Sequence, residues 1–116
     1  MRTAPPEEKK RRRLARQEAR RASKLLVLHT SEDQDTILES LCAAGKVGGK
    51  ELIHSLGADW RKLAGVLAAF DKLCQKHRIY NPIQKDKSDG TYWLSPYYAR
   101  PLQKELDAHY ETSWED

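Results

Sequence analysis

The chain has 116 residues, of which 39% are hydrophobic and 33% are charged, and this is enough for one compact domain. No stretch approaches the roughly 20 apolar residues of a membrane-spanning helix, and no apolar segment follows the charged N-terminus as it does in a signal peptide. We therefore expect no membrane partner and a place in the cytoplasm, associated with the nucleoid, or in the nucleus of a eukaryote.

The formal net charge of +4 is unevenly distributed along the chain. Residues 1–24 hold ten Lys/Arg and three Glu, a net charge of +7, which leaves −3 for residues 25–116. A body with net negative charge is not drawn to DNA or RNA by its overall charge. Attraction to a polyanion must therefore come from the N-terminal segment and from any locally basic face of the body.

The residues that usually carry catalysis or bind metals form no recognisable pattern. Cys42 and Cys74 lie far apart within apolar helical patterns, without a CxxC pair or a histidine at ligand spacing, and we expect both to be buried structural thiols. The four histidines have no evident nucleophile or carboxylate partner, and no phosphate-cradling glycine motif is present. The sequence therefore predicts no metal, no cofactor and no enzymatic activity.

A basic arm over residues 1–28 precedes a domain over residues 29–116. The cations of the arm lie among Ala, Leu and Gln, which favour helix. Arg13, Arg16, Arg20 and Lys24 follow steps of three and four, so a helix aligns them as one cationic stripe. We expect the arm to be disordered in isolation or helical against a polyanion. The arm residues predicted to bind nucleic acid are Lys9, Lys10, Arg11, Arg12, Arg13, Arg16, Arg20, Arg21 and Lys24.

The stretch EEKKRRRLARQEARRASK resembles the arginine-rich RNA-binding peptides of phage antiterminator proteins, which also mix clustered Arg with Ala, Gln and Glu. Arg outnumbers Lys here, and the guanidinium group bonds phosphate or guanine in two places. Two alternatives stay open, a solvated tail and a nuclear localisation signal.

The body begins with three predicted helices. Thr30 and Ser31 followed by Gln34 are close to a capping box, and an apolar face continues until Gly45 ends the first helix. A short extended piece within residues 45–49 leads to a second helix, which Gly57 closes.

The third helix runs from Trp60 to about His77, with Asp59 as its N-cap, and it is amphipathic. Its predicted outer face carries the cations Arg61, Lys62, Lys72 and Lys76. Gly65, Ala68 and Ala69 lie among these cations, and their small size allows close approach to a partner such as a DNA groove. For Trp60 we favour a core or rim position beneath the second helix.

A β-hairpin and a final helix follow. The predicted strands are Ile79–Gln84 and Thr91–Leu94, joined by a long basic tip that contains Lys85 and Lys87. The final helix starts at Ser95-Pro96 and has an apolar stripe of Leu102, Leu106 and Tyr110. This stripe either packs back onto its own domain or forms a homodimer interface.

The order of helix, glycine-rich turn, short helix, long helix and hairpin over residues 31–94 resembles the winged helix-turn-helix superfamily, within a fold that is mainly α with a small β-hairpin. The resemblance rests on Glu51–Gly57, the amphipathic Asp59–His77 and the wing Ile79–Leu94. It implies that the third helix enters the major groove through Arg61 and Lys62, and that Lys85 and Lys87 contact phosphates. An acid and a bulky aromatic at Asp59-Trp60, where polar readers are expected, make sequence-specific readout the weaker part of this expectation.

The function favoured by these observations is nucleic-acid binding, with DNA preferred over RNA. The first hypothesis is a DNA-binding transcriptional or replication regulator that uses the arm, the third helix and the wing. The alternatives are an RNA-binding arginine-rich-motif protein that acts on transcription machinery, and a winged-helix adaptor that binds a protein partner.

Overall fold

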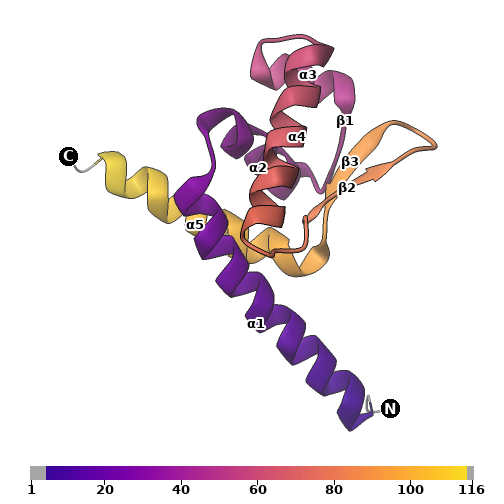
Figure 1. Cartoon of the computed structure of the whole chain (residues 1–116), viewed down its shortest axis with the longest axis vertical. Helices are drawn as coiled ribbons and strands as arrows, with labels where there is room; N and C mark the ends of the chain where they lie inside the picture. The colour runs from indigo at the N-terminus through magenta and orange to yellow at the C-terminus, as the bar shows by residue number, and fades with distance from the viewer. Residues whose placement is uncertain (1–4, 115–116) are drawn as a thin grey trace.

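The computed structural model describes residues 5–114, with side chains up to Glu111, and over this range the chain is mainly helical with a small antiparallel sheet (Figure 1). The helices are α1 (Pro6–His29), α2 (Glu32–Ala44), α3 (Gly49–Leu56), α4 (Trp60–Lys76) and α5 (Pro96–Trp114). The strands are β1 (Lys46–Gly48), β2 (Ile83–Asp86) and β3 (Thr91–Leu94). The prediction of a mainly α chain with a small β element is confirmed, and no described helix is long and apolar enough to cross a membrane.

Local sequence signals fix the ends of the central helices. Ser31 and Gln34 form a complete capping box, because each side chain accepts a hydrogen bond from the backbone N–H of the other residue. Asp59 caps α4 by accepting from the N–H of Lys62 at 2.9 Å. Gly57 ends α3 at a φ of 62°, in the left-handed region that glycine adopts without steric cost.

The sheet has the strand order β1-β3-β2, so the predicted extended piece near residue 46 pairs with the hairpin and completes a three-stranded sheet. The predicted first hairpin strand, Ile79–Gln84, was placed too early, since β2 begins at Ile83. Pro82 has no N–H to contribute to a ladder, and the Asn81 side chain accepts from the N–H of Ile83 at 2.9 Å, which holds the turn before the strand.

The N-terminal segment is one continuous helix whose second half belongs to the packed body. Ala19, Ala22 and Leu26 of α1 are buried in the same cluster as Leu102 and Leu106 of α5, and the contact between α1 and α5 is the most extensive between any two described elements. The boundary expected between residues 28 and 29 therefore falls at the end of a helix that already contributes to the core.

The apolar stripe of α5 packs within the chain rather than on its surface. Leu102 and Leu106 are fully buried, and Tyr110 packs against the core and donates a hydrogen bond to Asp35 at 2.7 Å. Of the two arrangements expected for this stripe, the structure shows packing onto its own domain. The same stripe is not available as a homodimer surface.

Candidate nucleic-acid interface

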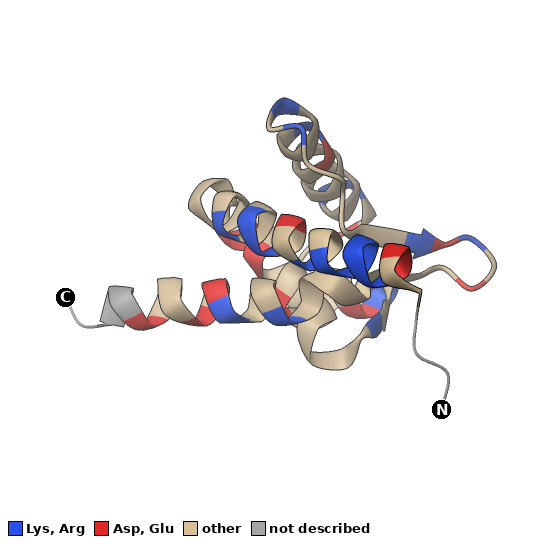
Figure 2. Cartoon of the chain, turned by 90° about the horizontal axis from the view of Figure 1, so that it is seen from below, with Lys and Arg blue, Asp and Glu red and all other residues tan. Residues whose placement is uncertain are grey.

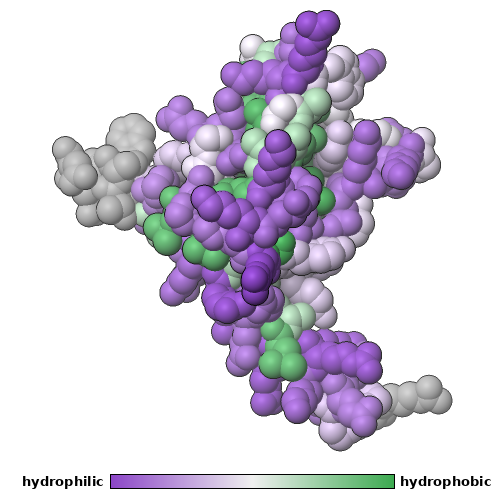
Figure 3. Space-filling model, viewed as in Figure 1, coloured by the Kyte–Doolittle hydropathy of each residue, from purple (hydrophilic) through white to green (hydrophobic). Residues whose placement is uncertain are grey.

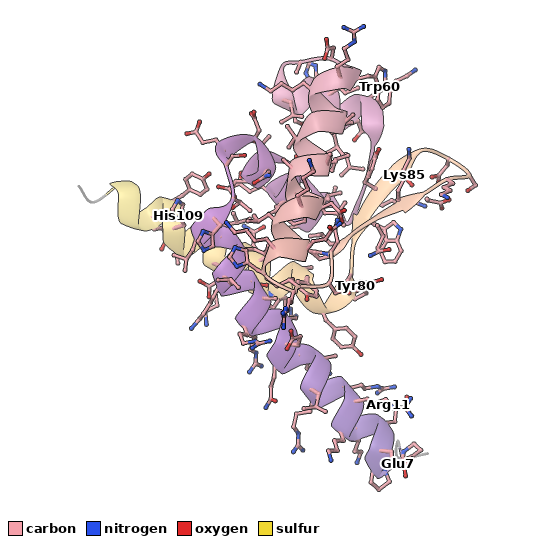
Figure 4. The ribbon with its side chains drawn as sticks, viewed as in Figure 1. Glu7, Arg11, Trp60, Tyr80, Lys85 and His109 are labelled. Carbon is pink, nitrogen blue, oxygen red and sulfur yellow. The ribbon has the colours of Figure 1, made fainter. Side chains whose placement is uncertain are left out.

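The first half of α1 projects from the body as an exposed cationic rod. Between Pro6 and Glu18 every side chain is exposed except the half-buried Ala15, and Glu7 and Arg11 lie far from the packed body in Figure 4. Figure 3 shows this projecting part as hydrophilic apart from one small apolar patch. The Arg12 side chain donates to Glu8 at 2.6 Å one turn away, an exposed pair of the kind that adds only a few tenths of a kcal/mol.

A groove of about 1060 Å³ lies between the second half of α1 and the first half of α5. The described side chains that line it include one carboxylate, Glu105, and the exposed phenol ring of Tyr97. Its cations are Arg16, Arg20, Arg21, Lys24, Arg100 and Lys104. Figure 2 shows Lys and Arg on both helices in the view from below. Arg21 also forms an ion pair with Glu18 at 3.0 Å, so six cations beside two carboxylates leave this groove electropositive, although the body as a whole is not.

Two of these cations, Arg100 and Lys104, were missed by the sequence analysis. The expectation for the final helix rested on its apolar stripe and not on its basic residues. Arg100 and Lys104 are four residues apart, so a helix aligns them on one side, opposite the stripe of Leu102 and Leu106. The sequence alone could have indicated that these two cations lie on one side of the helix, whereas it could not indicate that α5 packs against α1.

The predicted cations of α4 lie on its solvent-exposed side. Arg61, Lys72 and Lys76 are exposed, and no carboxylate of residues 5–111 forms an ion pair with them. Lys62 differs, because its Nζ lies 3.2 Å from a carboxylate oxygen of Asp33 on α2. The acid within α4, Asp71, accepts hydrogen bonds from Gln75 and Asn81. The face that α4 presents to solvent is therefore cationic without a competing exposed acid.

Small exposed residues separate the two cationic ends of α4. Gly65, Ala68 and Ala69 are all exposed, and nothing lies within 4 Å of a Cβ added at Gly65. Trp60 is 57% exposed and its ring lies against Gly49 at the start of α3, so it occupies the rim, one of the two positions expected for it. The structure places the Trp60 end of α4 and the Glu7 end of α1 at opposite ends of the molecule (Figure 4).

The hairpin is not the long basic tip expected from the sequence, because Lys85 and Asp86 belong to β2 and the charges alternate. The Lys46 Nζ lies 3.3 Å from Asp86 and 3.2 Å from Asp89, so this single cation of β1 pairs with both acids of the hairpin and offsets only one of their two charges. Hydrogen bonds from the hydroxyl and backbone N–H of Ser88, more than the ion pair with Lys46, lower the pKa of Asp86. Lys85 and Lys87 remain exposed, with the Lys85 Nζ 5.6 Å from the centre of the Tyr92 ring.

The cysteines and the acidic residues form no reactive or metal-binding site within the described part of the chain. Burial raises the pKa of the Cys42 thiol to about 11 and that of Cys74 to about 12, so both are protonated thiols at neutral pH. No group of three His, Cys, Asp or Glu among the described residues is arranged to hold a metal ion.

No known protein family, curated protein or solved structure matches this chain.

Proposed function

We propose that this protein binds nucleic acid, with duplex DNA preferred, and acts as a regulator of transcription or replication. The observation that carries the proposal is the convergence of Arg100 and Lys104 of α5 with four cations of α1 at one groove. If α1 were only a solvated basic tail, its charges would act independently of the body, and there would be no reason for cations of α5 to lie beside them. Cations held by two packed helices offer fixed partners for successive phosphates, which is how backbone contacts position a protein on DNA.

The winged-helix geometry is the second part of the proposal. It is supported by the element order α2-β1-α3-α4-β2-β3, by the pairing of β1 with β3, and by the exposed cations of α4. In this arrangement α4 lies in the major groove and the hairpin lies over the flanking backbone through Lys85 and Lys87. Because Asp86 and Asp89 lie beside these lysines, the hairpin contributes less to affinity than α1 and α4 do.

A second candidate, structured RNA, is favoured by one specific observation. The first half of α1 is an isolated helix with arginines around its circumference and without a packed neighbour on residues 6–14, which suits insertion along a folded RNA. A hairpin RNA therefore belongs in the same titration as the DNA. Tighter binding of the RNA across the salt range would replace the DNA proposal by this one.

The test is a fluorescence anisotropy titration of duplex DNA at several salt concentrations, using Arg100→Gln and the matched single-charge control Lys50→Gln on the exposed side of α3. Each phosphate contact contributes about −0.9 to the slope of log K against log salt on duplex DNA. We expect Arg100→Gln to reduce that slope by about one contact and to weaken binding, and Lys50→Gln to leave the slope unchanged. Equal behaviour of the two variants would show that the groove is not the binding surface.

A further inference from the structure

Two of the cationic surfaces formed by the described residues share no residue and no helix. The groove is lined only by α1 and α5, whereas the exposed cationic face of α4 consists of Arg61, Lys72 and Lys76, here called the α4 face. If both contacted one duplex, they would have to point toward a common side. Their directions follow from the helical positions of a few residues.

On α1, the groove and the contact with α4 lie on opposite sides. Arg20 lines the groove, and His29 stacks on His77 at the end of α4 with ring centroids 4.7 Å apart and planes at 19°. His29 follows Arg20 by nine residues, and at about 100° per residue the two side chains leave the helix about 180° apart. Helix α1 therefore stands between α4 and the groove.

On α4, the cations point away from the core. Phe70 is 1% exposed, and Lys72, two residues later, leaves the helix about 200° from it. His77, which faces α1, follows Phe70 by seven residues and lies within about 20° of it. The α4 face is thus turned away from α1, just as the groove is turned away from α4.

We propose that one molecule holds two segments of duplex DNA at once, one in the groove and one on the α4 face, and so bridges them. The inference rests on the proposed function. Two packed helices separate the surfaces, a thickness of about 20 Å, so a straight duplex lying on one surface does not reach the other. Both surfaces carry the charge that duplex phosphates require, since the six cations of the groove exceed the two acids beside them, Glu105 and Glu18, and no described carboxylate forms an ion pair with the α4 face.

The acidic part of the body limits where else a duplex can lie. Glu32, Asp33 and Asp35 open α2, and burial followed by the nearby charges of Asp35 and Asp107 raises the pKa of Glu39. The carboxylates of Glu39, Asp35 and Asp107 make the region where α2 meets α5 locally negative. Such a region repels phosphates, so a duplex does not wrap from one cationic surface to the other through it.

The test compares two full-length variants that each remove two exposed cations, Arg20→Gln/Arg100→Gln in the groove and Lys72→Gln/Lys76→Gln on the α4 face. One duplex is fixed to beads, saturated with protein and offered a second, fluorescent duplex. We expect the wild type to retain the fluorescent duplex and each variant to retain about tenfold less, while each variant still binds a single duplex in solution by anisotropy. Unchanged melting temperatures of both variants verify their folding.

A mixture of the two variants separates bridging by one molecule from bridging by a dimer. In a dimer, each variant supplies the surface that the other lacks, so the mixture would recover capture and overturn the proposal. Capture as low with the mixture as with either variant alone supports it. If the wild type binds a single duplex but captures no second one, bridging is wrong while the proposed function stands. If the wild type binds no duplex even in solution, the proposed function itself fails.

Discussion

Gly49 is the one described glycine at which an added Cβ would meet a neighbour within 4 Å. A Cβ at this position would lie 2.7 Å from Cη2 of Trp60, whereas a Cβ at Gly48 meets nothing within 4 Å. We expect Gly49→Ala to displace the Trp60 ring and to lower the free energy of unfolding by about 1 kcal/mol, the low end of the cost of overpacking, because the contact is with the far end of an exposed side chain. The measurement is urea unfolding followed by tryptophan fluorescence. Gly48→Ala is the matched control, and an equal loss in both variants would mean that the ring contact is not the cause.

A buried carboxylate joins three helices near the end of α1. Asp35 is 3% exposed and accepts hydrogen bonds from Thr30 and, at 2.7 Å, from the Tyr110 hydroxyl. Burial, and then the hydrogen bond to Asp35, raises the pKa of Tyr110 well above its usual value. Removing one partner of a bond to a charged group costs about 1.5–3 kcal/mol, so we expect Tyr110→Phe to destabilise the protein by about that amount at neutral pH.

The same hydrogen bond predicts how stability depends on alkaline pH. Because the pKa of Tyr110 is higher in the folded than in the unfolded chain, its contribution is fully present below about pH 10 and is lost as the pH rises above that value. The free energy of unfolding of the wild type should therefore fall more steeply than that of Tyr110→Phe between about pH 9 and 11. Parallel curves for the two proteins would contradict this assignment.

Helices were the elements that the sequence predicted best, because their signals are local. The capping box at Ser31, the N-cap at Asp59 and the glycines at positions 45 and 57 each act within one turn. The start of β2 was misplaced because strand pairing depends on a partner distant in sequence, and Ile79 and Tyr80 have high β propensity without a ladder to join. Pairing of β1 with β3 was likewise invisible in a segment of three residues.

Helix α4 offers a test that separates stability from binding. Gly65 lies in the middle of α4, is exposed, and has open space where a Cβ would be. Glycine in a helix costs about 0.5–1 kcal/mol relative to alanine, so Gly65→Ala should raise the free energy of unfolding by about that amount. Gly65→Gln adds a long neutral side chain to the α4 face, and we expect it to weaken duplex binding about tenfold if the backbone approaches DNA closely. Unchanged duplex binding by Gly65→Gln would argue against α4 lying in the major groove of DNA.

At the scale of the whole molecule, the sequence predicted the cations but not which of them meet. The arm stripe of Arg16, Arg20 and Lys24 followed from helical periodicity, and the exposed side of α4 did too. The groove depends instead on how α1 crosses α5, which is decided by Ala19, Ala22 and Leu26 packing with residues some 80 positions later in the same cluster. We expected an arm without a large apolar surface to be disordered in isolation. Four small or medium apolar residues, Ala19, Ala22, Leu26 and Val27, nevertheless bury part of α1 once a second helix provides the other half of the contact.

Because the second half of α1 is packed against α5, the effect of shortening the chain on stability depends on where in α1 it is cut. Deleting residues 1–24 removes the buried Ala19, Ala22 and Ser23 and uncovers Leu102 and Leu106, each worth about 1.5–3 kcal/mol when buried. Against a total stability of about 5–15 kcal/mol, and with about 4–8 °C of melting temperature per kcal/mol, we expect a loss of more than about 10 °C.

Deleting residues 1–13 removes the projecting cations, and among the described residues 5–13 no side chain is buried, so the deletion should shift the melting temperature by only a few degrees, about the scale of a surface change. The shorter deletion keeps the groove intact and should retain part of the affinity for DNA, with a smaller salt slope because fewer phosphates are contacted. Calorimetry of both shortened chains provides the measurement. Equal melting temperatures for both shortened chains would mean that residues 14–24 of α1 do not stabilise the fold. The α1 cations of the groove would then not be held in fixed positions beside α5.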